Sequence, residues 1–135
     1  MGCCGRPDPP APAPPPPPPR AMNFAFDMGE TITRYPAEFY TIMECLRRGG
    51  HKVVILSAIG LTHMGAVDEA RGILSNLPFD FGHFDLVTVP EDHTGTNKAN
   101  YCRENNICML IDDAPYNIAG LHELSPATAR VQVMP

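Results

Sequence analysis

The sequence predicts an α/β fold: a Rossmann-like three-layer sandwich with about five parallel strands and helices on both faces. Short apolar runs alternate with stretches of helical periodicity over residues 22–135, which is the pattern of successive βαβ units. The apolar runs are nearly continuous rather than alternating with polar residues, as expected for strands buried on both faces. We therefore expect one domain at residues 22–135, preceded by a separate segment at residues 1–21.

The first strand and the first helix are the most clearly patterned elements. Residues 23–26, NFAF, form an apolar run that ends at Asp27. Residues 37–48 then place apolar side chains at i, i+3, i+4 and i+7, which gives a helix one apolar face. Pro36 stands near the expected helix start and two glycines follow its end, so the boundaries agree with the usual start and stop signals.

The remaining elements are read from the same two patterns. Compact runs of β-branched and aliphatic residues predict strands, and longer mixed stretches predict helices. Asn76 and Pro78 close the second helix, and Thr96 is the expected N-cap of the third. In chain order we expect a strand at 51–56, a helix at about 63–76, a strand at 84–89, a helix at 96–105, a strand at 107–111, a helix at 116–124 and a strand at 129–133.

Three of the expected strands end in polar groups. Asp27, Ser57 and Asp112 each follow an apolar run, and Asp113 comes next to the last of them. Ligands of open parallel sheets bind beyond the carboxyl ends of the strands, so these side chains are expected to share a site. Each residue alone has a second interpretation, because Asp and Ser often begin turns or cap the next helix. Their occurrence together at one edge favours the shared site.

The chemistry expected at that edge is the binding of a cation and a phosphate. Three crowded carboxylates must share protons or hold a cation, and hard oxygen ligands at an open edge suit Mg²⁺. Ser57 and the backbone N–H groups after it, beginning with Ala58, could hold phosphate oxygens. Lys98, at the start of the helix before the fourth strand, could neutralise the phosphate and the carboxylates. Taken alone, Lys98 would be interpreted as a surface lysine.

In their order and spacing, these residues resemble the four motifs of the haloacid dehalogenase (HAD) superfamily of phosphohydrolases, over nearly all of residues 23–133. FAFDMGET is similar to the hhhDxDGT motif, VVILSA to the strand that ends in Ser or Thr, and MLIDD to the hhhDD motif. The matched positions are Asp27 for the nucleophile, Thr31 for the threonine, Ser57, Lys98 for the motif-three lysine, and Asp112 with Asp113.

The resemblance implies a Mg²⁺-dependent phosphohydrolase in which Asp27 attacks phosphorus and the resulting aspartyl-phosphate is hydrolysed by water. It implies that Ser57, Ala58 and Lys98 hold the phosphate, and that Mg²⁺ is held by Asp27, the backbone carbonyl of Gly29, Asp112 and Asp113. The expected connections are too short for the cap domain that many family members carry. An open site would suit a phosphorylated small molecule or an accessible phosphate on a macromolecule.

The sequence departs from the family at one catalytic position. Gly29 stands where the phosphatases have the Asp that acts as general acid and base, and Glu30 stands where they have Gly. Loss of such a group typically costs about 10²–10⁴-fold in rate. Glu30 could reach in, or the enzyme could be slow. The alternative is a catalytically impaired HAD-like protein that binds phosphate or Mg²⁺, or serves in an interaction; a third option is a different reaction on the same fold.

The proline-rich segment at residues 1–21 predicts a disordered extension, because proline runs favour extended chain without backbone donors. Pro15, Pro18 and Arg20 fit the P-x-x-P-x-R pattern of a ligand for an SH3-type partner. The Met-Gly-Cys-Cys start, with Cys3 and Cys4, also resembles an acylation signal, although it lacks the Ser or Thr of the myristoylation pattern.

Charge and composition limit the classes of partner and compartment. From residue 21 onward the chain carries 8 Lys and Arg against 14 Asp and Glu, which argues against a nucleic-acid-binding patch. No apolar stretch approaches the roughly 20 residues of a membrane span. The five cysteines form no C-x-x-C pair and no secretory signal is evident, so we expect a cytoplasmic protein with reduced thiols.

Overall fold

The computed structural model describes residues 5–16, 20–60 and 65–134, and within them one five-stranded sheet. All strand pairs are parallel and the strand order is β3-β2-β1-β4-β5. The fold class predicted from the sequence is therefore confirmed. The strands are β1 (Asn23–Phe26), β2 (Lys52–Ala58), β3 (Asp85–Val89), β4 (Met109–Asp112) and β5 (Ala129–Gln132).

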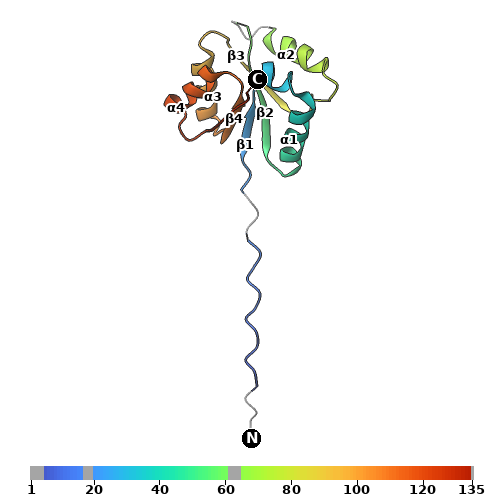
Figure 1. Ribbon diagram of the computed structural model, residues 1–135, viewed down its shortest axis with the longest axis vertical. Helices are drawn as coiled ribbons and strands as arrows, with labels where there is room; N and C mark the ends of the chain where they lie inside the picture. The colour runs from blue at the N-terminus through green and yellow to red at the C-terminus, as the bar shows by residue number, and fades with distance from the viewer. Residues whose placement is uncertain (1–4, 17–19, 61–64, 135) are drawn as a thin grey trace.

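Within the described residues, four α-helices complete a three-layer sandwich. Because parallel crossovers are right-handed, the chain places its helices on one face while it moves from β1 to β3, and on the other once it returns to β4 and β5. Accordingly, the helices at 36–48 and 66–75 lie on one side of the sheet and those at 94–104 and 115–124 lie on the other (Figure 1). In chain order the helices are α1 (Pro36–Arg48), α2 (Ala66–Ser75), α3 (Thr94–Glu104) and α4 (Pro115–Leu124).

The connections at which a cap domain would be inserted are short. Between β1 and α1 the chain makes only a short turn, η1 (Met28–Ile32), closed by the N–H of Thr33 donating to the carbonyl oxygen of Met28, and a few further residues. Between β3 and α3 it has four residues, 90–93. Both connections lie wholly within the described residues, which contain no cap domain.

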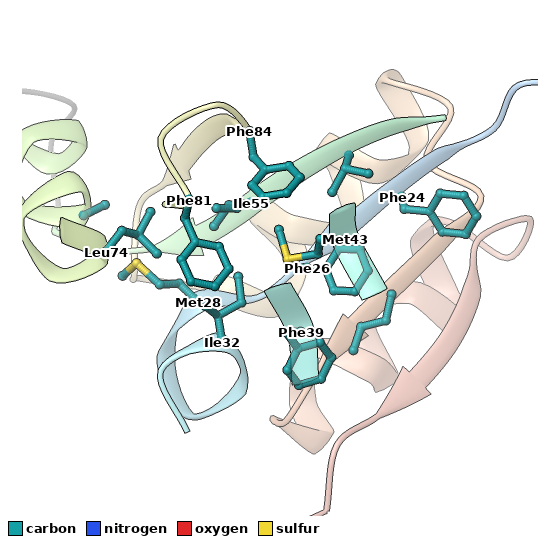
Figure 2. Close-up of a cluster of buried hydrophobic side chains, with 13 residues drawn as sticks. Phe24, Phe26, Met28, Ile32, Phe39, Met43, Ile55, Leu74, Phe81 and Phe84 are labelled. Carbon is teal, nitrogen blue, oxygen red and sulfur yellow. The ribbon is translucent and has the colours of Figure 1, made fainter. Parts of the chain in front are cut away.

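Two apolar clusters fill the space on the two faces of the sheet. Phe24 and Phe26 of β1 pack against Phe39 and Met43 of α1, in the larger cluster shown in Figure 2. Since neighbouring residues of a strand point to opposite faces, Ala25 belongs to the smaller cluster, beneath α3 and α4. Every strand at the centre of the sheet is thus buried on both sides, which explains its continuous apolar sequence.

The element boundaries differ from those predicted at two places that matter for the site. β2 continues through Ser57 to Ala58, which is two residues beyond its predicted end at residue 56. α3 begins at Thr94, and its N-cap is His93 in a left-handed conformation (φ 56°) without a side-chain cap bond. The predicted N-cap at Thr96 is therefore wrong, because that residue lies inside the first turn. Residues 63 and 64, at the predicted start of the second helix, lie outside the described residues.

Glu44 is a buried carboxylate on α1 that fixes the loop after α2. It accepts hydrogen bonds from Arg47 and Arg48 of its own helix, and its Oε2 lies 2.7 Å from His83 Nε2. The bonds to Arg47, His83 and Arg48 lower the pKa of Glu44 to about 2. The charged carboxylate is consequently favoured by the folded state.

Replacing this carboxylate should weaken the fold in a pH-dependent way. Its folded-state pKa is depressed, so its stabilising contribution is present above the usual pKa near 4.5 and is lost as pH falls toward about 2. We expect Glu44→Gln to lower the melting temperature at pH 7, and the difference from the wild type to shrink between pH 4.5 and pH 2. Thermal unfolding at a series of pH values measures this. A difference that stays constant with pH would contradict the assigned role.

The proline-rich segment lies apart from the domain. Residues 5–16 are exposed and contain no helix or strand. They lie on the side of the sheet where β1 begins, opposite to the strand carboxyl ends (Figure 1). Pro18 of the SH3-ligand pattern and the start with Cys3 and Cys4 lie outside the described residues, so both interpretations stay predictions. Among the described residues, no helix has the length and apolarity needed to cross a membrane.

Candidate active site

The candidate site lies where β1 and β4 adjoin at the centre of the sheet. The connection after β1 leads to one face and the connection after β4 leads to the other, which is the switch point where α/β sheets bind ligands. Asp27 follows β1 directly, and its backbone N–H donates to the carbonyl oxygen of Ile111 at 2.8 Å. This bond continues the pairing of the strands, so Asp27 is held beside Asp112 at the end of β4.

Lys98 joins these two carboxylates. Its Nζ donates to Asp27 Oδ1 and to Asp112 Oδ2, each at 2.7 Å. The side chain is only 1% exposed, so its charge depends on these partners. Burial alone would lower the pKa of Lys98, but the attraction of Asp27 and Asp112 outweighs burial and the pKa is raised. The lysine is therefore a charged member of the site and not a solvated surface residue.

The pKa of Asp27 is set by effects that oppose one another. Thr31 Oγ1, within the turn that follows β1, donates to its Oδ2 at 3.0 Å. Burial raises the pKa of Asp27, the charge of Lys98 lowers it, and the charge of Asp112 raises it, with the result at about 7. Thr31 and Lys98 thus fix both oxygens of this carboxylate in place.

Asp112 is oriented by residues that sequence reasoning did not identify. Asn117 Nδ2, in the first turn of α4, donates to its Oδ2 at 3.0 Å, while the backbone N–H of Ala114 donates to Oδ1 at 2.9 Å. Thr94, the first residue of α3, in turn donates to Asn117 Oδ1 at 2.9 Å. The sequence shows only that an Asn follows the Asp-Asp pair closely, at the beginning of a helix. Nothing in the neighbouring residues indicates that the Asn117 side chain is buried.

Three carboxylates offer oxygen ligands to a cation. One oxygen each from Asp27, Asp112 and half-buried Asp113 lie within 4.8 Å of one another. A carboxylate has about four lone-pair sites, and the hydrogen bonds described above occupy two at Asp27 and three at Asp112. Sites therefore remain on all three residues, and an all-oxygen set of this kind fits a hard cation such as Mg²⁺.

An open cleft of about 680 Å³ lies next to the carboxylates. Ser57 of β2 faces this cleft with only 3% of its surface exposed, and its hydroxyl makes no hydrogen bond to another described residue. Among the described residues no fully buried side-chain N or O atom lacks a partner, so the unpartnered Ser57 hydroxyl must open onto the cleft, where it is available to a ligand. The cleft is lined by Asp27, Met28, Gly29, Glu30, Ser57, Ala58, Ile59, Glu91, Asp92, Thr94, Lys98, Asp112, Asp113, Ala114, Tyr116 and Asn117.

The turn after β1 determines what stands at the altered motif position. Gly29 has ordinary extended torsion angles (φ −69°, ψ 132°), and an added Cβ would meet nothing within 4 Å. Glu30 adopts the left-handed conformation (φ 58°), which Gly usually occupies. Its side chain is 70% exposed and its carboxylate lies 3.5 Å from Arg34 Nη1. The Glu30 carboxylate therefore lies at the exposed surface, in a weak ion pair with Arg34.

The structure brings together all the residues that the sequence proposed for the site. The seven positions are Asp27, Gly29, Ser57, Ala58, Lys98, Asp112 and Asp113, and they line one cleft. No protein-family model, curated protein or solved structure gave a significant match to this chain. The roles of these residues are therefore argued from the geometry of the site.

Proposed function

We propose that this chain is a Mg²⁺-dependent phosphohydrolase that acts through an aspartyl-phosphate and is slow on substrates with poor leaving groups. The observation that carries the proposal is the buried carboxylate–lysine–carboxylate triad of Asp27, Lys98 and Asp112 beside an open cleft. The order and spacing of the strand-end residues further support membership of the HAD superfamily, with a capless site.

Asp27 is the proposed nucleophile. It stands at the junction of the two central strands, its carboxylate is held by Thr31 and Lys98, and it lines the cleft. One of its oxygens would form a bond to phosphorus while the bond between phosphorus and the leaving oxygen breaks. Water would then release phosphate and regenerate the carboxylate. Covalent catalysis of this kind divides one difficult step into two easier ones.

The neighbouring groups would bind and orient the phosphoryl group. The Ser57 hydroxyl and the N–H of Ala58 can donate to phosphoryl oxygens, and the Lys98 ammonium supplies a fixed positive charge. Asp27, Asp112, Asp113 and the backbone carbonyl of Gly29 are the proposed Mg²⁺ ligands. The bound ion would withdraw charge from the phosphoryl oxygens.

The proposed weakness of this enzyme is proton transfer. Gly29 has no side chain at the position of the general acid and base, and the Glu30 carboxylate is paired with Arg34. Substrates whose leaving group needs no proton, such as acyl and aryl phosphates, should therefore be preferred. The same observation favours a second candidate function, in which the domain binds phosphate or Mg²⁺ without turning a substrate over.

An assay of the full chain against the matched Asp27→Asn variant tests the proposal. We expect slow, Mg²⁺-dependent release of phosphate from acetyl phosphate and p-nitrophenyl phosphate, and its loss in Asp27→Asn because an amide is a poor nucleophile. Binding of Mg²⁺ without turnover in the wild type would favour the non-catalytic candidate. Failure of both the wild type and the variant to bind Mg²⁺ would refute the assignment of the site.

A further inference from the structure

The cleft beside the triad is strongly acidic. Lys98 is the one cation among its described lining residues, and Asp27 and Asp112 already share that charge. Six carboxylates line the cleft, and three of them belong to the proposed metal site. Of the remaining three, Glu30 is paired with Arg34. The two left over are Glu91 and Asp92, and neither forms an ion pair with another described residue.

Glu91 and Asp92 form a fixed part of the rim. Both are exposed and lie on the connection between β3 and α3. The backbone N–H of Glu91 donates to the carbonyl of Gly60 at 2.8 Å. The side chain of Asn97 donates to the carbonyl of Asp92 at 2.6 Å and to that of Pro90 at 3.0 Å. These bonds hold the backbone of the loop that carries the two carboxylates lining the cleft.

An aromatic ring lines the same cleft as the two acids. Tyr116, in the first turn of α4, is 64% exposed and lines the same cleft. The face of an exposed tyrosine ring attracts ammonium groups. Two unpaired carboxylates and an aromatic face are together a suitable environment for an organic cation.

The deep end of the cleft presents different chemistry. Ser57 is only 3% exposed there, and its hydroxyl opens onto the cleft without a hydrogen-bond partner among the described residues. It can donate to an anionic oxygen next to the Lys98 ammonium. The cleft thus combines an anion-binding end with a cation-attracting rim, and this polarity indicates a ligand that carries both charges.

We propose that, among phosphomonoesters with leaving groups of similar acidity, the preferred substrates are small ones whose leaving group bears an ammonium group, which Glu91, Asp92 and Tyr116 receive at the rim. This inference rests on the proposed function, because it deepens the substrate class of the same site. A purely anionic phosphoester would meet repulsion from the rim, whereas a cationic leaving group offsets it. Because the rim is exposed, the preference should weaken with increasing salt.

The test compares probes of similar size and different charge on the full chain with Mg²⁺. The probes are phosphocholine, propyl phosphate and phosphoglycolate, whose leaving groups are cationic, neutral and anionic. We expect phosphocholine to bind about tenfold more tightly than propyl phosphate at low salt, from two exposed charges and one aromatic ring. Phosphoglycolate should bind most weakly. Dissociation constants from calorimetry and kcat/KM from phosphate release are both measured.

Matched variants assign the preference to the rim. In Glu91→Gln/Asp92→Asn the ratio of the two dissociation constants should fall toward one. The control Asp68→Asn/Glu69→Gln removes two exposed acids of α2 that do not line the cleft, and it should keep the ratio. A ratio near one in the wild type, or an equal change in both double variants, would overturn the inference, as would the absence of binding by every probe.

The two proposals fail in different ways. If acetyl phosphate is hydrolysed through Asp27 while phosphocholine has no advantage over propyl phosphate, the hydrolase stands and the rim preference is refuted. If no probe is hydrolysed but phosphocholine still binds more tightly through Glu91 and Asp92, the rim preference stands and the hydrolase fails.

Discussion

Replacing Gly29 with Asp should raise the rate of hydrolysis of alkyl phosphates by about 10²–10⁴-fold, the usual contribution of a general acid and base. The backbone at Gly29 already has torsion angles that Asp adopts readily, and an added Cβ meets no atom within 4 Å. The carboxylate would stand at the cleft that Gly29 lines. Steady-state kinetics with an alkyl phosphate and with acetyl phosphate measure the gain.

The size of the gain should depend on the leaving group. An alkoxide needs a proton and acetate does not, so Gly29→Asp should help the alkyl phosphate more. Gly29→Asn is the matched control, because it has nearly the same shape and cannot exchange the proton. Glu30→Gln should leave the rate of the wild type unchanged, since the Glu30 carboxylate is paired with Arg34 at the surface. An equal gain from Asn and Asp would show that proton transfer is not the missing step.

Removing the charge of Lys98 should have the largest effect on the fold. Lys98→Met would leave Asp27 and Asp112 side by side in a buried site without their shared cation. Breaking a buried ion pair from one side costs about 3–5 kcal/mol in the free energy of unfolding. Turnover should be lost together with that stability. Denaturant unfolding of the metal-free protein measures the change in free energy.

Two further variants test whether the loss of stability comes from the missing charge between Asp27 and Asp112, and not from replacing any lysine with Met. Lys52, the chain's other lysine, is exposed at the start of β2, and Lys52→Met should change the free energy of unfolding by no more than about 0.5 kcal/mol. Adding Asp112→Asn to Lys98→Met removes one of the unpaired carboxylates and should restore part of the stability. If Lys98→Met is as stable as the wild type, the triad does not hold the site together.

The sequence predicted the fold and the members of the site because both depend on local patterns. Continuous apolar runs identified the strands, and their parallel arrangement required Asp27, Ser57 and Asp112 to meet at one edge. The position of Lys98 was inferred from its place before the fourth strand, and its complete burial between two carboxylates appears only in three dimensions.

Other features could not be predicted because they depend on tertiary contacts. Asn117 orients Asp112 through a hydrogen bond that is strong because both side chains are buried. Nothing in the neighbouring residues indicates that burial. The surface pairing of Glu30 with Arg34 follows from the left-handed turn at Glu30, a conformation that its residue type does not favour. The cap of α3 was predicted at a Thr, whereas the cap is His93, whose carbonyl oxygen accepts the backbone N–H of Asn97 at 2.9 Å.

The most direct test of the account is to look for a phosphoryl group on Asp27. The full chain is mixed with acetyl phosphate and Mg²⁺, quenched in acid and analysed by intact-protein and peptide mass spectrometry. Since Gly29 leaves no base to activate water, we predict that one phosphoryl group accumulates on Asp27 in the wild type, that less accumulates in Gly29→Asp, and that none is found in Asp27→Asn. Phosphate release without a phosphoryl group on Asp27, or an adduct that persists in Asp27→Asn, would contradict the account.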